Sequence, residues 1–215
     1  MYKYIRAVLP LCLASGAWAD LLTNGNFESG NTGFTTDYTL VATNGTISTQ
    51  PGQYGIVSDP STAFLNGYTS FGDHTTGSGL LMLVDGNTGN VWSETVSVTP
   101  STLYTFTGWV ASASTQNLAS LALFVDGSQA GSDFGAPSTV GNWTKWTQTF
   151  TTGSSTTSIA LSIQDVNGQP LTFGNDFALD DLSLNGPAIS GVPEPGYLPM
   201  LLPAVVWMVR RHIRR

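Results

Sequence analysis

The sequence predicts an all-β protein, folded as an antiparallel β-sandwich or jelly roll. Between residues 20 and 190, no segment keeps apolar residues at i, i+3, i+4 and i+7 over three turns, as an amphipathic helix would. Several segments alternate apolar and polar residues instead, which is typical of half-buried antiparallel strands. Turn dipeptides separate these segments. Many short strands with regular turns and no helix indicate a sandwich of two sheets.

The individual strands follow in chain order. Residues 80–84 are continuously apolar, which predicts a strand buried on both faces. In residues 103–110, aromatic and aliphatic side chains share one face, and threonines share the other. Threonines also line one side of residues 146–151, and aliphatic residues alternate in 158–163. The dipeptides that accept positive φ in tight turns are Asn44-Gly45, Asn66-Gly67, Asp85-Gly86, Asp126-Gly127 and Asn167-Gly168.

The first 19 residues have the features of a secretory signal peptide. Lys3 and Arg6 precede a short apolar run, and Ala17-Trp18-Ala19 matches an Ala-x-Ala cleavage site. We therefore expect export and cleavage after Ala19, which leaves Asp20 as the first residue. An uncleaved membrane anchor is the alternative, but the apolar run is too short to span a bilayer comfortably.

Composition narrows the chemistry of the exported part. The one cysteine, Cys12, lies in the signal peptide, so the mature chain has neither a disulfide nor a thiolate site. Of the 14 acidic residues, all except Glu194 lie between Asp20 and Asp181, where Lys145 is the only base. Such an acidic domain repels phosphates, which excludes a nucleic-acid partner. The remaining length, roughly 170 residues, suits one well-buried domain, expected over residues 20–187.

The C-terminal segment, residues 188–215, has the composition of a tether followed by a membrane address. Val192-Pro193-Glu194-Pro195 is followed by an apolar run over about 197–209, interrupted by two prolines. Arg210, Arg211, Arg214 and Arg215 then hold the C-terminus on the cytoplasmic side.

This order of Pro-Glu-Pro box, apolar run and basic end resembles the PEP-CTERM sorting signal of Gram-negative bacteria. The resemblance implies that an exosortase recognises the box, removes the tail and passes the protein to the cell surface or extracellular matrix. The apolar run is short and broken by prolines, which departs from that pattern. A plain C-terminal anchor is the alternative.

Four segments of the middle region carry a second resemblance. They are LLTNGNFESG (residues 21–30), FALDDLSL (177–184), and the longer runs 92–110 and 142–164. In this order and spacing they are similar to galactose-binding-like jelly-roll carbohydrate-binding modules, the accessory domains of xylanases and cellulases. The similarity spans nearly all of residues 20–186. It implies a sandwich that binds polysaccharide without catalysis, although such folds host many functions.

The same resemblance implies a structural Ca²⁺ site. In that family, an acid of the opening motif and an acid of the closing Asp-Asp motif meet where the first and last strands lie side by side. Here these acids are Glu28 and Asp180 or Asp181, with Asn24 and Asn26 helping through side chain or carbonyl oxygens. Because strand residues alternate, we expect Asp180 and Asp181 to point to opposite faces, so that only one binds strongly. The alternative is that these acids cap turns.

A sugar-binding face needs flat aromatic rings with polar groups beside them. Trp109 is the first candidate, because it is in phase with Thr105 and Thr107 rather than with the apolar set. Trp92, close to Glu94, is the second. The further candidates are Tyr54, Tyr68 and Phe71, in the Gly/Ser/Asn-rich region before residue 80. The alternative for each ring is ordinary packing, which we expect for Trp143 and Trp146.

Two other motifs are less informative. His74 stands beside Asp73, but nothing around it resembles a nucleophile elbow, so no catalytic residue is assigned. Residues 85–90 (DGNTGN) partly match an EF-hand loop yet lack its final acid, and they are interpreted as a hairpin turn.

The sequence therefore favours an exported, non-catalytic module that binds extracellular polysaccharide. One alternative is a structural matrix or adhesion protein with no sugar site, of which a threonine-lined surface-binding face would be a variant. A small glycan hydrolase is the remote alternative.

Overall fold

The computed structural model describes residues 19–41, 50–63, 68–168 and 174–186. The predicted signal peptide up to residue 18, the Pro-Glu-Pro box, the apolar run and the arginine tail lie outside the described residues. Across the described segments, no helix is long and apolar enough to cross a membrane.

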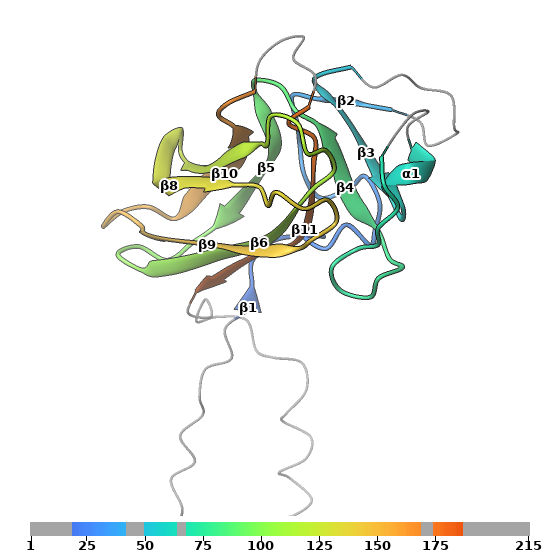
Figure 1. Cartoon of the computed structure of the whole chain (residues 1–215). Helices are drawn as coiled ribbons and strands as arrows, with labels where there is room; N and C mark the ends of the chain where they lie inside the picture. The colour runs from blue at the N-terminus through green and yellow to red at the C-terminus, as the bar shows by residue number, and fades with distance from the viewer. Residues whose placement is uncertain (1–18, 42–49, 64–67, 169–173, 187–215) are drawn as a thin grey trace, which may run out of the picture.

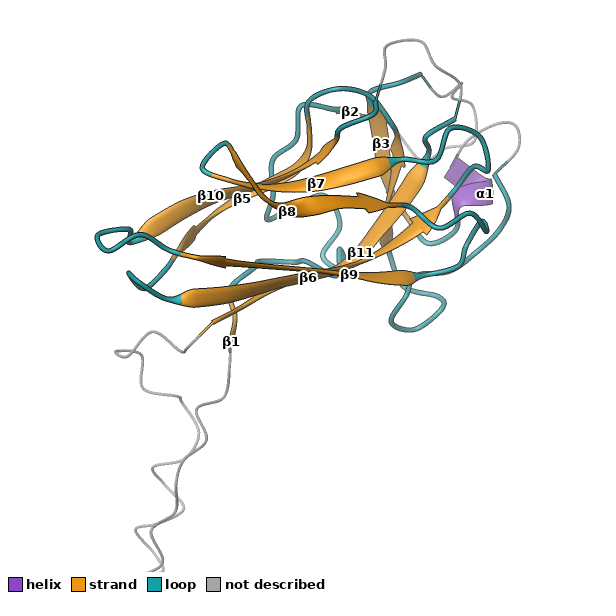
Figure 2. Cartoon of the chain, turned by 60° about the vertical axis from the view of Figure 1, so that its left-hand side comes forward, coloured by secondary structure: helices purple, strands orange, loops and turns teal. Residues whose placement is uncertain are grey.

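The chain forms two sheets that lie over each other as layers (Figure 2). The larger sheet has seven strands in the order β2-β3-β4-β11-β6-β9, with β1 paired to β11. The smaller sheet has four strands in the order β5-β10-β7-β8. Apart from the parallel pair β2–β3, neighbouring strands are antiparallel, which confirms the predicted sandwich.

The strands of the larger sheet are β1 (Ala19–Asp20), β2 (Thr39–Leu40), β3 (Gln53–Val57), β4 (Leu81–Asp85), β6 (Leu103–Ser112), β9 (Thr144–Thr151) and β11 (Phe177–Gly186). Those of the smaller sheet are β5 (Asn90–Ser97), β7 (Ser120–Val125), β8 (Ser128–Gly135) and β10 (Ser158–Asp165). The short helix α1 (Pro60–Ala63) lies beside β3 (Figure 1).

Large side chains from both sheets fill the space between the layers. The bulkiest fully buried residues are Trp92, Trp146, Tyr104, Phe27, Phe106 and Phe177. The Trp146 ring packs edge-on against Phe106 at 5.3 Å and nearly parallel to Phe134 at 5.7 Å between centroids. Burial of so much aromatic surface is the main stabilising contribution of this core.

A second, smaller core covers the outer face of the larger sheet. It contains Val41, Val57, Ala63, Leu81, Leu83, Ala113 and Ala178. Strand β4 lies between the two cores, because Met82 and Val84 face the inter-sheet core while Leu81 and Leu83 face the second one. All five residues of β4 are buried, so the prediction of a strand buried on both faces is confirmed.

One of the predicted hairpin turns is present in the structure, and another is not. Asp126 and Gly127 both have positive φ (48° and 77°) and join the paired strands β7 and β8, as a two-residue hairpin requires. Residues 86–89, however, connect β4 in the larger sheet to β5 in the smaller one. The interpretation of residues 85–90 as a hairpin turn is therefore wrong, since this loop crosses from one layer to the other.

The two described ends of the domain are adjacent. Ala19 and Asp20 pair with Gly186 and Asn185. The Asp20 carboxylate accepts hydrogen bonds from the N–H groups of Leu22 (3.1 Å) and Leu184 (2.9 Å). The first and last strands thus lie side by side, and the segment after β1 is positioned against β11.

Candidate functional site

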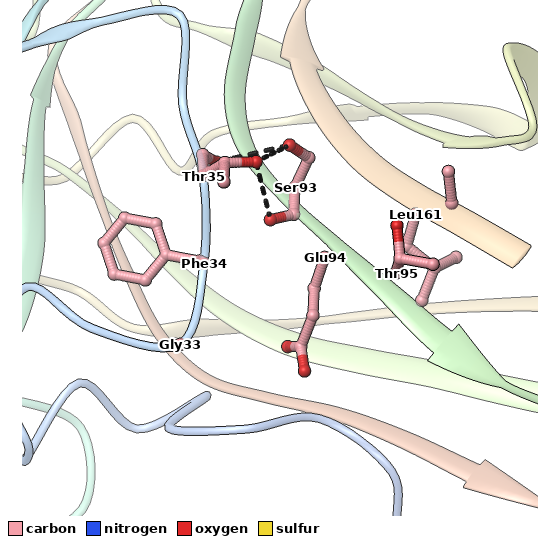
Figure 3. Close-up of a pocket in the computed structure, with 8 residues that line it drawn as sticks. Gly33, Phe34, Thr35, Ser93, Glu94, Thr95 and Leu161 are labelled. Atoms are coloured by element: carbon pink, nitrogen blue, oxygen red, sulfur yellow. Dashed lines mark hydrogen bonds between the residues drawn. The ribbon is translucent and has the colours of Figure 1, made fainter.

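A groove runs along the edge of the smaller sheet, beside β5. The segment around Thr35 crosses this edge and forms an isolated antiparallel bridge with Ser93. Main-chain hydrogen bonds of 2.7 and 2.8 Å join the two residues, and their hydroxyl oxygens are 2.8 Å apart (Figure 3). The groove has a volume of about 470 Å³ and is lined by Gly33, Phe34, Thr35, Ser93, Glu94, Thr95, Ala160 and Leu161. We call it the edge groove.

The edge strand presents main-chain groups to the edge groove. The N–H and C=O of Ser93 bond to Thr35, so they face away from β10. Hydrogen-bonding direction alternates along an antiparallel strand, so the N–H and C=O of Thr95 also face away from β10. The groove therefore combines backbone donors and acceptors with the hydroxyls of Thr35, Ser93 and Thr95.

Glu94 is the one ionisable residue among those that line the edge groove. Its two carboxylate oxygens accept hydrogen bonds from the N–H of Thr23 at 3.0 and 3.1 Å, which holds the side chain in place. Partial burial raises the pKa of Glu94; the bond from Thr23 opposes this shift, and the charge of Asp20 adds to it. The carboxylate is thus a fixed, partly desolvated hydrogen-bond acceptor.

Phe34 supplies the aromatic surface of the edge groove, and sequence reasoning missed it. Its ring packs edge-on against Phe27 (5.7 Å between centroids) and Tyr54 (6.2 Å), so its orientation is fixed from behind. In Figure 3 the ring lies on the crossing segment, on the opposite side of the groove from Thr95 and Leu161. No sequence motif marks Phe34, because only the pairing of Thr35 with Ser93 brings it to β5.

The prediction that Trp92 and Tyr54 bind sugar is wrong, because both side chains are buried. Trp92 is 0% exposed and Tyr54 only 4% exposed, and both belong to the inter-sheet core. Trp92 lies opposite Ile163 on the inner face of the smaller sheet. The neighbouring residue Val91 is equally buried, so the alternation of apolar and polar residues fails at this point of β5 and did not identify the inner face.

The other predicted rings gather over the outer face of the larger sheet. Trp109 is half-buried there, and the His74 ring stacks on it at 3.7 Å between centroids. Trp143 lies 6.2 Å from His74 and 6.1 Å from Phe71, and its Nε1–H donates to the carbonyl of Gly72. Phe71 and Tyr68 pack against the second core. This ring cluster therefore holds the segment 68–79 on the sheet, and one face of Trp109 is covered.

The opening and closing motifs do meet, at the segment 72–80. Glu28 Oε1 accepts a hydrogen bond from the N–H of Leu80 (2.8 Å). Asp180 Oδ2 accepts one from the N–H of His74 (2.8 Å). The approach depends on Gly25, because a Cβ there would lie 1.9 Å from the carbonyl oxygen of Leu182. The Leu182 N–H in turn donates to the Gly25 carbonyl at 2.9 Å.

Asp180 and Asp181 both turn toward this segment, so the expectation that they point to opposite faces is wrong. A bulge interrupts β11 between Asp180 and Ser183, and Asp181 has a φ of 47°. Its carboxylate consequently accepts hydrogen bonds from His74 Nδ1 and Thr75 Oγ1, each at 2.6 Å. Asp180 itself is 1% exposed, and burial, with the charge of Asp181, raises its pKa to about 7 despite the bond from His74.

The donors suit a hard cation only in part. Glu28 and Asp180 supply carboxylates to one segment, and backbone carbonyls would have to complete the six to eight oxygens that Ca²⁺ takes. Asn24 is fully used within its own loop: it donates to the carbonyls of Gly30 and Thr32 and accepts from Ser29. Asn26 accepts a long bond from the Glu28 N–H. Among the described residues, no three Asp, Glu or His side chains group closely enough to hold an ion by themselves.

Asp73 and His74 are neighbours in sequence but do not act on one another. The buried Asp73 carboxylate accepts hydrogen bonds from the N–H groups of Thr76 (2.8 Å) and Gly79 (2.7 Å). Burial alone would raise the pKa of Asp73, but these bonds outweigh it and lower the pKa. Asp73 thus shapes the segment 72–80, and His74 pairs with Asp181 instead.

No protein-family model matches the sequence, and no curated protein sequence matches it. Solved structures do resemble the fold. The xylan-binding CBM22-1 domain of Xyn10C from Paenibacillus barcinonensis is 13% identical with a TM-score of 0.50, over 81% of this chain and 97% of that domain. The tandem CBM22-1–CBM22-2 domain of the same protein is 16% identical with a TM-score of 0.51, over 86% of this chain and 49% of that one. An arabinose-bound GH51 α-L-arabinofuranosidase is 13% identical with a TM-score of 0.52, over 80% and 27%. At these levels of sequence identity, the similarity concerns the fold alone.

Proposed function

We propose that this chain is an exported, non-catalytic carbohydrate-binding module, and that the edge groove holds the glycan. The observation that carries the proposal is the composition of the groove. It brings one fixed aromatic ring, one carboxylate and three hydroxyl-bearing side chains to an edge strand, in a volume of about 470 Å³. Pockets of this size, with an apolar wall and a few placed polar groups, are typical of small-ligand sites.

Each part of the edge groove has a role in holding a sugar. The exposed part of the Phe34 ring offers an apolar surface to the C–H face of a pyranose. Glu94 accepts hydrogen bonds from sugar hydroxyls, and its own position is held by Thr23. The hydroxyls of Ser93, Thr35 and Thr95 donate and accept at the rim. Support also comes from the fold, since the similar CBM22-1 domain is described as xylan-binding.

The proposed module binds without hydrolysing. Cleavage of a glycosidic bond needs two carboxyl groups, about 5–10 Å apart, on either side of the bond. Glu94 is the only carboxylate among the described residues that line the edge groove. The His74–Asp181 pair lies over the larger sheet, so neither side chain lines the groove beside β5.

Sorting and a structural ion complete the proposal. After export and cleavage behind Ala19, an exosortase would recognise Pro193-Glu194-Pro195 and deliver the domain to the surface or extracellular matrix of a Gram-negative bacterium. Calcium would be held by Glu28 and Asp180 together with backbone carbonyls of the segment between them. Its contribution would be to stabilise that segment, not to bind sugar.

One observation favours the structural or adhesive alternative. On the outer face of the larger sheet, Thr105 lies opposite Thr149, and Thr107 lies opposite Thr147. These cross-strand pairs form two regular rows of hydroxyls on β6 and β9. A threonine-lined face of this kind suits adhesion to an ordered surface without any sugar groove.

Affinity electrophoresis of residues 20–191 through gels that contain single polysaccharides tests the proposal. We expect at least one polymer to retard the protein. Phe34→Ala should abolish that retardation, because the groove loses its aromatic wall. Leu103→Ala is the matched control, since Leu103 is 55% exposed on β6 and remote from the groove. Equal retardation of both variants would reject the edge groove as the site, and retardation by no polymer would favour the adhesive alternative.

A further inference from the structure

We infer that the edge groove selects neutral glycan chains and rejects those that carry uronic acid carboxylates. This inference rests on the proposed function of the groove and adds the chemical class of its ligand. It depends on the charges that surround the groove and on the place of the one base in the described domain.

The edge groove carries a negative charge, the carboxylate of Glu94, whose position is fixed. Both oxygens of Glu94 are bound to the Thr23 N–H, so the carboxylate stays where it lines the groove. Asp20 is close enough to raise the pKa of Glu94 through its charge. A carboxylate on the ligand would therefore meet a fixed negative charge in a site that is partly shielded from water, where repulsion is stronger than in bulk solvent.

No base compensates for this charge. Gly33, Phe34, Thr35, Ser93, Thr95, Ala160 and Leu161 complete the lining, and all are uncharged. Between Asp20 and Ser190 the sequence has a single Lys or Arg, Lys145. Recognition of a carboxylate normally uses Arg or Lys, and the groove offers neither.

Lys145 lies at the far side of the molecule from the edge groove. It is on β9, at one edge of the larger sheet, where it pairs across the strands with Trp109. Strand β9 packs against β8. Strand β8 and strand β5 form the two opposite edges of the smaller sheet (Figure 2). Strands β10 and β7 thus separate β5 from the sheet edge nearest to Lys145, and only β10 of these two contributes to the groove.

The wider field acts in the same direction. Thirteen of the 14 acidic residues belong to the exported domain, because only Glu194 lies beyond Asp181. A polyanion that approaches the groove is repelled by the domain as a whole, within a Debye length of about 8 Å at physiological salt. Hydroxyl groups, in contrast, find acceptors in Glu94 and in the Thr95 carbonyl.

The test compares polymers that differ only in charge. The probes are glucuronic-acid-bearing xylan, polygalacturonate and alginate, each beside the same polymer after reduction of its carboxyls to primary alcohols. The purified protein is used with a chelator present, so that divalent cations cannot bridge carboxylates. We expect at least one reduced polymer to be bound ten times more tightly or better than its acidic parent, which corresponds to about 1.4 kcal/mol. The difference should shrink as salt is added.

Two variants with the same change in net charge locate the effect. Glu94→Gln should reduce the preference for the reduced polymer at least threefold, because it removes the fixed charge and keeps a hydrogen-bonding side chain. Asp133→Asn, on the exposed part of β8, should leave the preference unchanged. Equal or tighter binding of an acidic parent would overturn the inference while the proposed function stands. An unchanged preference in Glu94→Gln would also overturn it. If neither the acidic nor the reduced polymers bind, the proposed function itself fails and this inference with it.

Discussion

The imidazole of His74 lies almost parallel to the indole of Trp109, with 3.7 Å between ring centroids and 16° between ring planes. The same histidine donates from Nδ1 to Asp181 and from its N–H to Asp180. One residue therefore joins the closing motif of β11 to the aromatic side chain of β6. Together with the Trp143–Gly72 and Glu28–Leu80 hydrogen bonds, His74 holds the segment 72–80 on the sheet by side-chain contacts.

The stacked pair should contribute measurably to stability. Trp109→Ala removes a half-buried ring, and we expect the free energy of unfolding in urea to fall by about 1–2 kcal/mol. His74→Ala should cost less. A double-mutant cycle should give a coupling energy of about 0.5–1.5 kcal/mol between them, because each single change already removes the stack. A coupling energy near zero would mean that the stacking makes no energetic contribution.

Gly25 should tolerate no side chain. A Cβ at this position would lie 1.9 Å from the carbonyl oxygen of Leu182, which belongs to β11 and cannot move aside freely. Gly25→Ala should therefore lower the free energy of unfolding by about 2–4 kcal/mol. Gly135→Ala serves as the control, since nothing lies within 4 Å of its added Cβ and its φ is not positive. Equal stability of the two variants in urea unfolding would show that the opening loop is not packed as described.

Asp176 should make the protein less stable as pH rises. Burial raises the pKa of Asp176 from 3.8 to about 8, and the charge of Asp85 adds to the shift, while a hydrogen bond from Tyr68 opposes it. Phe177 pairs with Val84, so Asp176 and Asp85 are the next residues across the two strands. Between about pH 4 and pH 8 the folded state holds a proton that the unfolded state has released. The free energy of unfolding therefore falls as pH rises through this window.

Asp176→Asn removes that titration, so its free energy of unfolding should decline less steeply over this window. At pH 8 the variant should be more stable than the parent protein by at least ~1 kcal/mol. Urea unfolding at several pH values measures both slopes, and Asp133→Asn is the matched control. A variant slope equal to that of the parent would mean that Asp176 is ionised throughout.

Calcium should raise the melting temperature of the domain, since a ligand that binds only the folded state stabilises it. We expect an increase of several degrees at saturating Ca²⁺, reversed by chelator. Glu28→Gln should lose this response, because Glu28 is one of the two proposed carboxylate ligands and is exposed, so its replacement leaves the core intact. Asp37→Asn, which removes an exposed acid beside Asn90, should keep it. Melting temperatures that do not respond to Ca²⁺ in the parent protein would reject the ion.

On strand β6, the alternation of apolar and polar residues predicted the structure correctly. Its alternation predicted both the strand and the faces of Tyr104, Phe106 and Val110, because side chains on a strand point to opposite sides in turn. The same rule failed on β11, where the bulge and the positive φ of Asp181 brought two successive carboxylates to one segment. The rule also failed to identify the inner face of β5, where Val91 and Trp92 are both fully buried.

By itself, the sequence determined the class of fold and pointed to Glu94 as a polar candidate for sugar binding, while the meeting of the opening and closing motifs was implied by the family resemblance. The reason is that alternation and turn dipeptides involve residues that are near one another in the sequence, so they can be recognised without a structure. Only the tertiary structure decided that Thr35 crosses the edge of β5, that Phe34 and Glu94 thereby line one groove, and that His74 covers Trp109. Thr35 and Ser93 are 58 positions apart in the sequence. His74 reaches Trp109 from a loop, across the outer face of the larger sheet. No local pattern encodes either contact.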